Sequence, residues 1–220
     1  MQRVPEPELM DDPAQALAYA RADFSEPHGM FIEKFRELFP NVEITGNVLD
    51  LGCGPADVSI RFARAYPRCH IDGVDGAAAM LEQGELAVKT AKLTDRIRLI
   101  KGVLPEVELS CKRYAVIISN SLLHHLHCPA VLWECVKKYA VKDTIVFVMD
   151  LMRPDSEASA KKLVDTYSGV EPLILKRDFY NSLCAAFTPE EVSVQLKQAG
   201  LNPLRVEIIS NHHFTVFGRL

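Results

Sequence analysis

The segment from Val48 to Ser59 has the residue types and spacing of a ligand-binding turn. Apolar, β-type residues surround one acid, Asp50, and end at Gly52-Cys53-Gly54, after which a helical pattern begins near Asp57. Glycines have no Cβ, so a backbone built from them can approach a ligand closely. The helix N-terminus behind them offers unpaired N–H groups and a partial positive charge. The sequence therefore predicts a ligand site at this turn.

The charges around the turn indicate which ligand it prefers. A dinucleotide-binding turn would have a third glycine where this chain has Asp57, and a carboxylate there would repel a pyrophosphate. Asp50 adds a second negative group, so the turn favours a ligand with an ammonium and a sulfonium. About twenty residues further on, Asp75 ends a second strand and is placed to bind ribose hydroxyls, while Asp72 alternates to the other face or sits at the start of the strand. A nicotinamide oxidoreductase is therefore disfavoured.

Three segments together resemble a known family. They are 48–55 (VLDLGCGP), 71–75 (IDGVD, with Met80-Leu81 downstream) and 117–126 (IISNSLLHHL). With them the chain resembles the class I S-adenosylmethionine-dependent methyltransferases, and most of all the small-molecule group that includes quinone C-methyltransferases and sugar O-methyltransferases. The resemblance spans about residues 46–150, and the last two predicted strands extend it to the end of the chain.

The resemblance implies S-adenosyl-L-methionine as cofactor. The glycine turn would follow its methionine part, Asp75 would bind its ribose, and Asn120 would lie by the sulfonium and the acceptor. Where the family usually has Asp or Asn for the adenine amino group, Gly102 is followed by Val103, so backbone groups would serve there. The expected cofactor-binding residues are Asp50, Gly52, Cys53, Gly54, Asp75, Gly76, Met80, Gly102, Val103, Leu104, Asn120 and, from a covering helix, Tyr19.

The candidate catalytic residues are His124, His125 and Asp150. Asp150 ends the fifth predicted strand, and the two histidines closely follow the fourth. In the family these strands are neighbours, so one histidine would take a proton from the acceptor while Asp150 fixes its tautomer. The sequence leaves open whether His124, His125 or neither is the base.

No metal site is predicted from the sequence. His124, His125, His127 and Cys128 form a cluster by composition, but their spacing does not match zinc-binding pairs and a second ligand pair is absent. Cys53 is interpreted as a small residue that faces the cofactor.

Strands and helices alternate from Val48 onward, which predicts parallel βαβ units. Strands are expected near 47–51, 70–74, 97–100, 115–119 and 144–149, with a final hairpin of 204–209 and 214–217. The predicted fold is therefore α/β and Rossmann-like, with a seven-stranded, mostly parallel sheet, a C-terminal antiparallel hairpin and helices on both faces. We expect an N-terminal helical cap over 1–46, with residues 1–11 loose. The cofactor-binding domain would span 47–220, with a substrate-side insertion at about 151–187.

Composition narrows the possible partners. The chain has 220 residues and a net charge of −4, which argues against a nucleic-acid partner. It has no apolar run long enough to span a membrane and no pattern of a signal peptide, and its six cysteines form no C-x-x-C pair. We expect a cytoplasmic monomer or homodimer that methylates an oxygen or carbon of a small organic acceptor. The alternative is a non-catalytic or regulatory protein that keeps only the fold and binds the cofactor.

Overall fold

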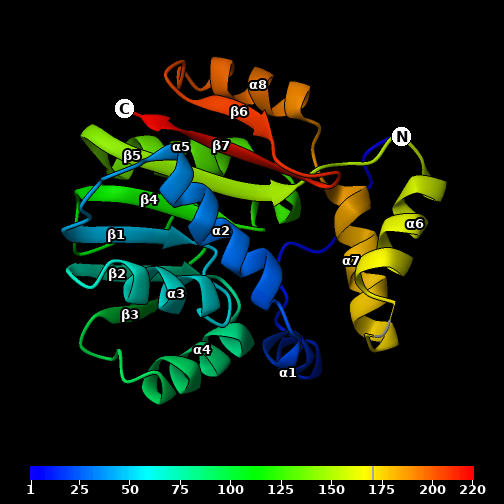
Figure 1. The fold of residues 1–220 in the computed structure, drawn as a ribbon, viewed down its shortest axis with the longest axis horizontal. Coiled ribbons are helices and arrows are strands. Elements are labelled where there is room, and N and C mark those ends of the chain that lie inside the picture. Colours follow the sequence, from blue (N-terminus) through cyan, green and yellow to red (C-terminus); the bar gives the residue numbers. More distant parts are fainter. Residues whose placement is uncertain (170) are drawn as a thin grey trace.

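The computed structural model describes residues 1–169 and 171–220 and has one seven-stranded sheet between layers of helices (Figure 1). The strand order is β3-β2-β1-β4-β5-β7-β6, and β1 to β5 pair in parallel. β7 is antiparallel to both of its neighbours, so the predicted fold class and C-terminal hairpin are confirmed. The strands are β1 (Gly46–Leu51), β2 (Cys69–Asp75), β3 (Ile97–Lys101), β4 (Tyr114–Asn120), β5 (Ala140–Leu151), β6 (Arg205–Ile208) and β7 (His213–Arg219).

The buried central strands place their carboxyl ends at one edge of the sheet. Val116 to Ser119 of β4 and Thr144 to Leu151 of β5 are buried on both faces, as expected for central strands of a parallel sheet. Because neighbouring strands run in the same direction, the residues at their carboxyl ends meet at one edge. This edge carries the residues from which chemistry was predicted.

One face of the sheet is covered by α2 (Ser25–Leu38), α3 (Asp57–Ala65) and α4 (Ala78–Thr90). Fully buried aromatic rings hold this layer: Phe35 of α2 lies 5.0 Å from Phe62 of α3 and 5.6 Å from Phe147 of β5, between ring centroids. Burying one such side chain stabilises the fold by about 1.5–3 kcal/mol. α2, in the predicted N-terminal cap, is therefore a layer of the core rather than only a cover over the cofactor.

The opposite face is covered by α5 (Ala130–Tyr139) and α8 (Pro189–Gln198). Trp133 is 1% exposed, and its indole N–H donates to Gln195 Oε1 at 3.0 Å. A capping box begins α8: Thr188 and Glu191 each accept a hydrogen bond from the other's backbone N–H.

The insertion forms two helices beyond the carboxyl ends of the strands, α6 (Glu157–Tyr167) and α7 (Leu173–Ala185); its residue 170 lies outside the described residues. A helical pattern over 156–167 marks the first helix in the sequence, whereas no such pattern marks the second. No side chain caps the N-terminus of α7, and Leu173 in its first turn is 83% exposed. The helix thus lacks both a start signal and a regular apolar stripe, and contacts with the rest of the chain hold it.

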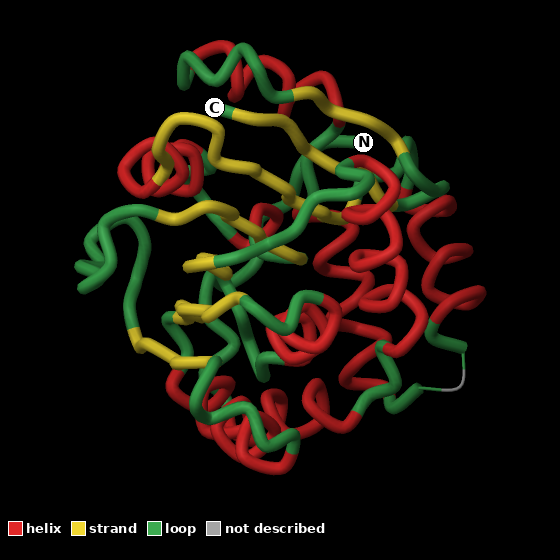
Figure 2. The backbone as a smooth tube through the Cα atoms, turned by 60° about the vertical axis from the view of Figure 1, so that its left-hand side comes forward, coloured by secondary structure: helices red, strands yellow, loops and turns green. Residues whose placement is uncertain are grey.

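The N-terminal residues differ from the expectation that residues 1–11 are loose. They form no helix or strand, but the Arg3 guanidinium donates to the carbonyls of Ala185, His124 and Leu126 at 2.5, 3.0 and 3.0 Å. The N-terminus lies beside the insertion in both Figure 1 and Figure 2. α1 (Pro13–Arg21) follows, and the side chain of Asp12 caps its N-terminus. The contacts of this segment join it to residues far along the chain, so local composition could not reveal them.

Candidate active site

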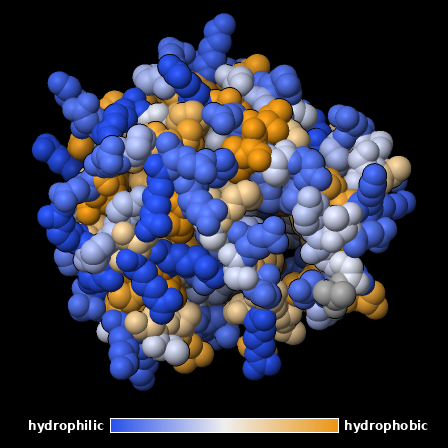
Figure 3. Space-filling view, viewed as in Figure 1, coloured by the Kyte–Doolittle hydropathy of each residue, from blue (hydrophilic) through white to orange (hydrophobic). Residues whose placement is uncertain are grey.

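A cavity of about 620 Å³ lies at the carboxyl ends of the strands, and Figure 3 shows the surface hollowed between the regions of α2 and α7. Its size is that of a ligand pocket. The cavity is lined by all but one of the predicted site residues: Tyr19, Asp50, Gly52, Cys53, Gly54, Asp75, Gly76, Met80, Gly102, Val103, Leu104, Asn120, His124 and His125. The exception is Asp150.

The glycine turn has the backbone that its sequence predicts. Gly52 and Gly54 have φ of +74° and +50°, in the left-handed region that favours glycine. A Cβ on Gly52 would lie 2.8 Å from the side chain of Leu122, whereas a Cβ on Gly54 would meet no atom within 4 Å. Gly52 is thus required for packing, and Gly54 leaves open space over its backbone.

Asp75 is held by the turn. Its Oδ2 accepts from the N–H of Gly54 and its Oδ1 from the N–H of Ala77, both at 2.8 Å. Burial raises the pKa of Asp75, and these backbone hydrogen bonds offset part of that rise. Each carboxylate oxygen keeps a lone pair for a further donor. Asp72 points away from the cavity, as predicted, and pairs with Arg98 at 2.8 Å.

The two acids expected to frame the turn have different environments. Asp50 is 1% exposed, accepts from the Ser59 hydroxyl at 2.5 Å, and has its pKa raised to about 7 by burial. Asp57 instead contacts His28 at 2.7 Å and Arg61 at 2.6 Å, and these partners lower its pKa despite its burial. The sequence predicted that the carboxylates of Asp50 and Asp57 together favour a cationic ligand. In the structure, Asp57 is paired with His28 and Arg61, so its charge is already matched within the protein.

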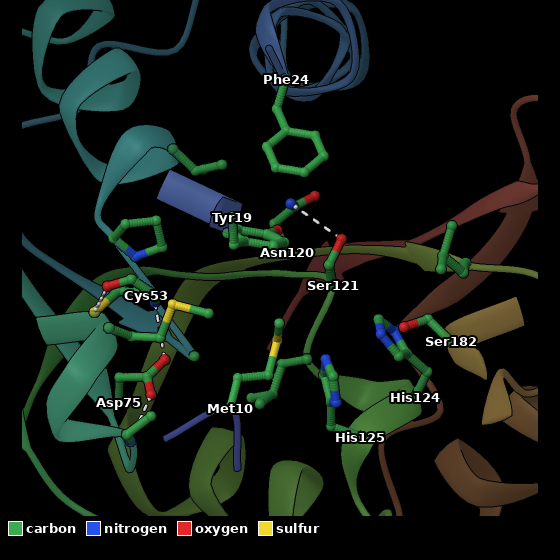
Figure 4. A pocket seen from close by; sticks show the side chains of 18 of the residues that line it. Met10, Tyr19, Phe24, Cys53, Asp75, Asn120, Ser121, His124, His125 and Ser182 are labelled. Carbon is green, nitrogen blue, oxygen red and sulfur yellow. Dashed lines mark hydrogen bonds between the residues drawn. The ribbon is translucent and has the colours of Figure 1, made fainter. Parts of the chain in front are cut away.

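Asn120 offers an unsatisfied acceptor. Its side-chain N–H donates to Ser121 Oγ at 3.2 Å, while its Oδ1 is buried without a hydrogen-bond partner in the described part of the chain. A buried polar atom of this kind costs free energy unless a ligand satisfies it. Tyr19 lies nearby (Figure 4), and burial raises the pKa of its hydroxyl to about 12, so it stays neutral.

The third-strand end of the cavity has no polar side chain at the expected adenine position. Val103 is 52% exposed and lines the cavity with Leu104. The N–H of Gly102 donates to the Asp75 carbonyl at 3.0 Å, and a Cβ on Gly102 would lie 2.3 Å from Val107. Val103 and Leu104 provide apolar contact and backbone groups here, and the next charged side chain along this wall is that of Glu106.

The predicted pairing of a histidine with Asp150 is found for His124, whose Nδ1 lies 2.5 Å from Asp150 Oδ1. Burial lowers the pKa of His124. The charge of Asp150 and its hydrogen bond raise this pKa, and together with Glu6 they outweigh burial, so the net shift is upward. Asp150 does not line the cavity, and its other oxygen accepts from the N–H of Leu123 at 2.7 Å. It therefore holds His124 and the short helix η1 (Leu123–His125) from behind the cavity wall, and does not itself face the cavity as a predicted catalytic residue would.

Glu6 joins the two histidines and was missed by the sequence analysis. Its Oε1 lies 3.8 Å from His124 Nε2 and 3.4 Å from His125 Nδ1, and accepts from the Ser182 hydroxyl at 2.9 Å. Burial raises the pKa of Glu6, whereas burial lowers the pKa of His125 to about 3. No motif marks Glu6, because it lies in an irregular segment more than a hundred residues before its partners.

Comparisons with known proteins agree with this geometry. Residues 48–140 match a family described as a methyltransferase domain. Protein arginine N-methyltransferase 1 of Schizosaccharomyces pombe is 32% identical over 113 residues, covering 51% of this chain and 29% of that protein. Malonyl-[acyl-carrier protein] O-methyltransferase of Priestia megaterium is 31% identical over 104 residues, covering 47% of this chain and 35% of that protein. The chain thus spans about a third of these curated relatives.

A solved structure shares the fold over nearly the whole chain. It is a SAM-dependent methyltransferase from Aquifex aeolicus, with a TM-score of 0.68 and 16% identity, covering 94% of this chain and 98% of that one. None of the described helices is long and apolar enough to cross a membrane. The sheet order and the glycine turn agree with the methyltransferase domain matched over residues 48–140, and the fold is that of the class I S-adenosylmethionine-dependent methyltransferases.

Proposed function

We propose that this protein transfers the methyl group of S-adenosyl-L-methionine to an oxygen or carbon of a small organic acceptor. The observation that carries the proposal is a single cavity with two chemically different ends (Figure 4). Asp75 and Cys53 lie at one end, and His124, His125 and Ser182 lie at the other. Asn120 and Ser121 lie between them, where the reacting groups would meet.

The first end suits the cofactor. Its methionine part would follow the open backbone at Gly54, its ribose hydroxyls would donate to Asp75, and its adenine would pack on Val103 and Leu104. The unpartnered Oδ1 of Asn120 would accept from the cofactor ammonium or attract its sulfonium. The cofactor supplies an activated methyl group, and these residues orient it.

The second end suits an acceptor that must lose a proton. His124, oriented by Asp150, is the proposed group that prepares the acceptor oxygen or carbon, and His125 is the alternative because its bare Nδ1 faces the same space. General acid–base assistance of this kind contributes on the order of 10²–10⁴ in rate. Holding the methyl carbon in line with the acceptor contributes a comparable or larger share.

Two other functions are tested by the same experiment. The arginine N-methyltransferase relatives favour an arginine side chain as acceptor, and the fold alone is compatible with a non-catalytic cofactor-binding protein. Binding of S-adenosyl-L-methionine is measured by isothermal titration, and transfer of its labelled methyl group is measured for phenols, carboxylic acids, quinones and an arginine-rich peptide. Transfer to a small oxygen or carbon acceptor supports the proposal. Exclusive labelling of the peptide, binding without transfer, or no binding contradicts it.

A further inference from the structure

Glu6, His124 and His125 converge at the acceptor end of the cavity. They come from the N-terminal segment and from η1, and one ligand-type atom from each lies within 4.8 Å of the others. Tetrahedral zinc with bonds of about 2.0 Å separates its ligand atoms by about 3.3 Å. The separations of 3.4 Å (His125 Nδ1 to Glu6 Oε1) and 3.8 Å (His124 Nε2 to Glu6 Oε1) are close to that value.

The remaining ring nitrogen of His124 is held by a carboxylate. His124 Nδ1 bonds Asp150 at 2.5 Å. Metal-binding histidines almost always use the second ring nitrogen in this way, with a carboxylate or a backbone carbonyl. The nitrogens left over, His124 Nε2 and His125 Nδ1, are the two that face Glu6.

His125 Nδ1 is an independent indication of a missing ligand. This nitrogen is buried and has no hydrogen-bond partner among the described residues. The His125 side chain is 14% exposed, so water reaches it poorly. A buried acceptor without a partner costs about 1–3 kcal/mol. Two imidazoles and one carboxylate also form the ligand set of catalytic zinc sites that keep an open position.

We propose that Glu6, His124 and His125 bind a divalent transition-metal ion, zinc by ligand preference, with its open coordination position facing the cavity. The inference deepens the proposed function, because an ion there would bind an acceptor oxygen. A zinc-bound hydroxyl releases its proton to water near neutral pH. The oxygen then attacks the methyl carbon while the carbon–sulfur bond breaks, its electron pair passes to sulfur, and S-adenosylhomocysteine forms. His124 then acts as a metal ligand, and the ion takes the place of a base.

The experiment measures metal binding without cofactor. The protein is freed of metal with a chelator and titrated with Zn²⁺ alone by calorimetry, and with Co²⁺ alone by visible absorption. We expect one ion per chain and a Co²⁺ spectrum without thiolate charge-transfer bands, which excludes the six free cysteines as ligands. Glu6→Gln and His125→Gln should each weaken Zn²⁺ binding by more than the roughly 10–100-fold expected for Asp150→Asn.

Two substitutions serve as matched controls. Glu26→Gln removes an exposed carboxylate that lines the cavity away from the cluster, and His70→Gln removes an exposed histidine on β2; neither should change Zn²⁺ affinity. Absence of stoichiometric binding by the unaltered protein, a thiolate spectrum, or unchanged affinity in both ligand variants would overturn the proposal. In that case, His124 is explained by its hydrogen bond to Asp150 and its proximity to Glu6 alone. Cofactor binding without zinc binding refutes only the metal site, and the reverse result refutes only the proposed function.

Discussion

The two ends of the cavity are built in different ways. The proposed cofactor end uses neighbouring residues, since the turn at 52–54 follows β1 directly and its partner Asp75 ends the adjacent strand. The acceptor end brings Glu6, His124 and Ser182 together from three distant parts of the chain. A site made of local motifs can be predicted from a sequence, whereas a site made of long-range contacts can be identified only in the folded structure.

The largest effect should follow from His124→Ala at the acceptor end. The substitution removes the imidazole that Asp150 orients, so turnover should fall by about 10²–10⁴. The affinity for S-adenosyl-L-methionine should stay the same, because His124 lies at the other end of the cavity from Asp75 (Figure 4). Steady-state rates and isothermal titration on the same sample provide the measurement. Turnover that stays within twofold would show that the histidine takes no part in the reaction.

Asp75→Ala should change cofactor affinity rather than turnover, the reverse of the effect expected for His124→Ala. Loss of charged hydrogen bonds to the ribose should weaken cofactor binding by about 1–3 kcal/mol, which corresponds to about 5- to 150-fold in the dissociation constant. Turnover at saturating cofactor should fall much less. Asp72→Ala is the matched control on the same strand, since Asp72 pairs with Arg98 outside the cavity. Equal dissociation constants for the two variants would remove the ribose role of Asp75.

The same contrast explains what the sequence could predict. The alternation of apolar strands and helices determined the sheet, and Gly52, Gly54 and Asp75 could be identified because a tight turn permits few residue types. α7 was missed because it has no capping side chain, and Glu6 because a flexible-looking, proline-rich segment carries no periodic signal. Asp150 was identified correctly as a partner of histidine, but its distance from the cavity surface depends on the packing of η1.

Arg3→Ala should affect mainly the acceptor end. Its guanidinium donates to three carbonyls and lies 3.9 Å from the ring centre of Phe187, so it holds the segment that carries Glu6. We expect a loss of about 1–3 kcal/mol in local anchoring, seen as a several-fold lower kcat/KM for the acceptor and faster hydrogen exchange in residues 1–11. Arg21→Ala, an exposed arginine at the end of α1, is the control. A change in cofactor affinity as large as that in kcat/KM would argue against separate ends.

The smallest effect concerns pH at the cofactor end. Burial raises the pKa of Asp50 from 3.8 to about 7, so this carboxyl is protonated below pH 7 in the free protein and attracts the cofactor ammonium only after it ionises. Affinity for S-adenosyl-L-methionine should therefore rise with pH up to about 7 and level off above it, by at most tenfold per pH unit.

The same shift has a consequence for stability. Between pH about 4 and 7 the unfolded chain has lost the Asp50 proton while the folded protein keeps it, so the free protein should become less stable as pH rises through this window. Asp50→Asn keeps an acceptor for the Ser59 hydroxyl and removes the titration, so it should flatten both pH profiles. Calorimetric titrations in buffers of different ionisation enthalpy should detect proton release on binding near pH 6 in the unaltered protein only. Proton release of equal size in the Asn variant would assign the pH dependence to another group, and would leave Asp50 a structural acid in the sheet.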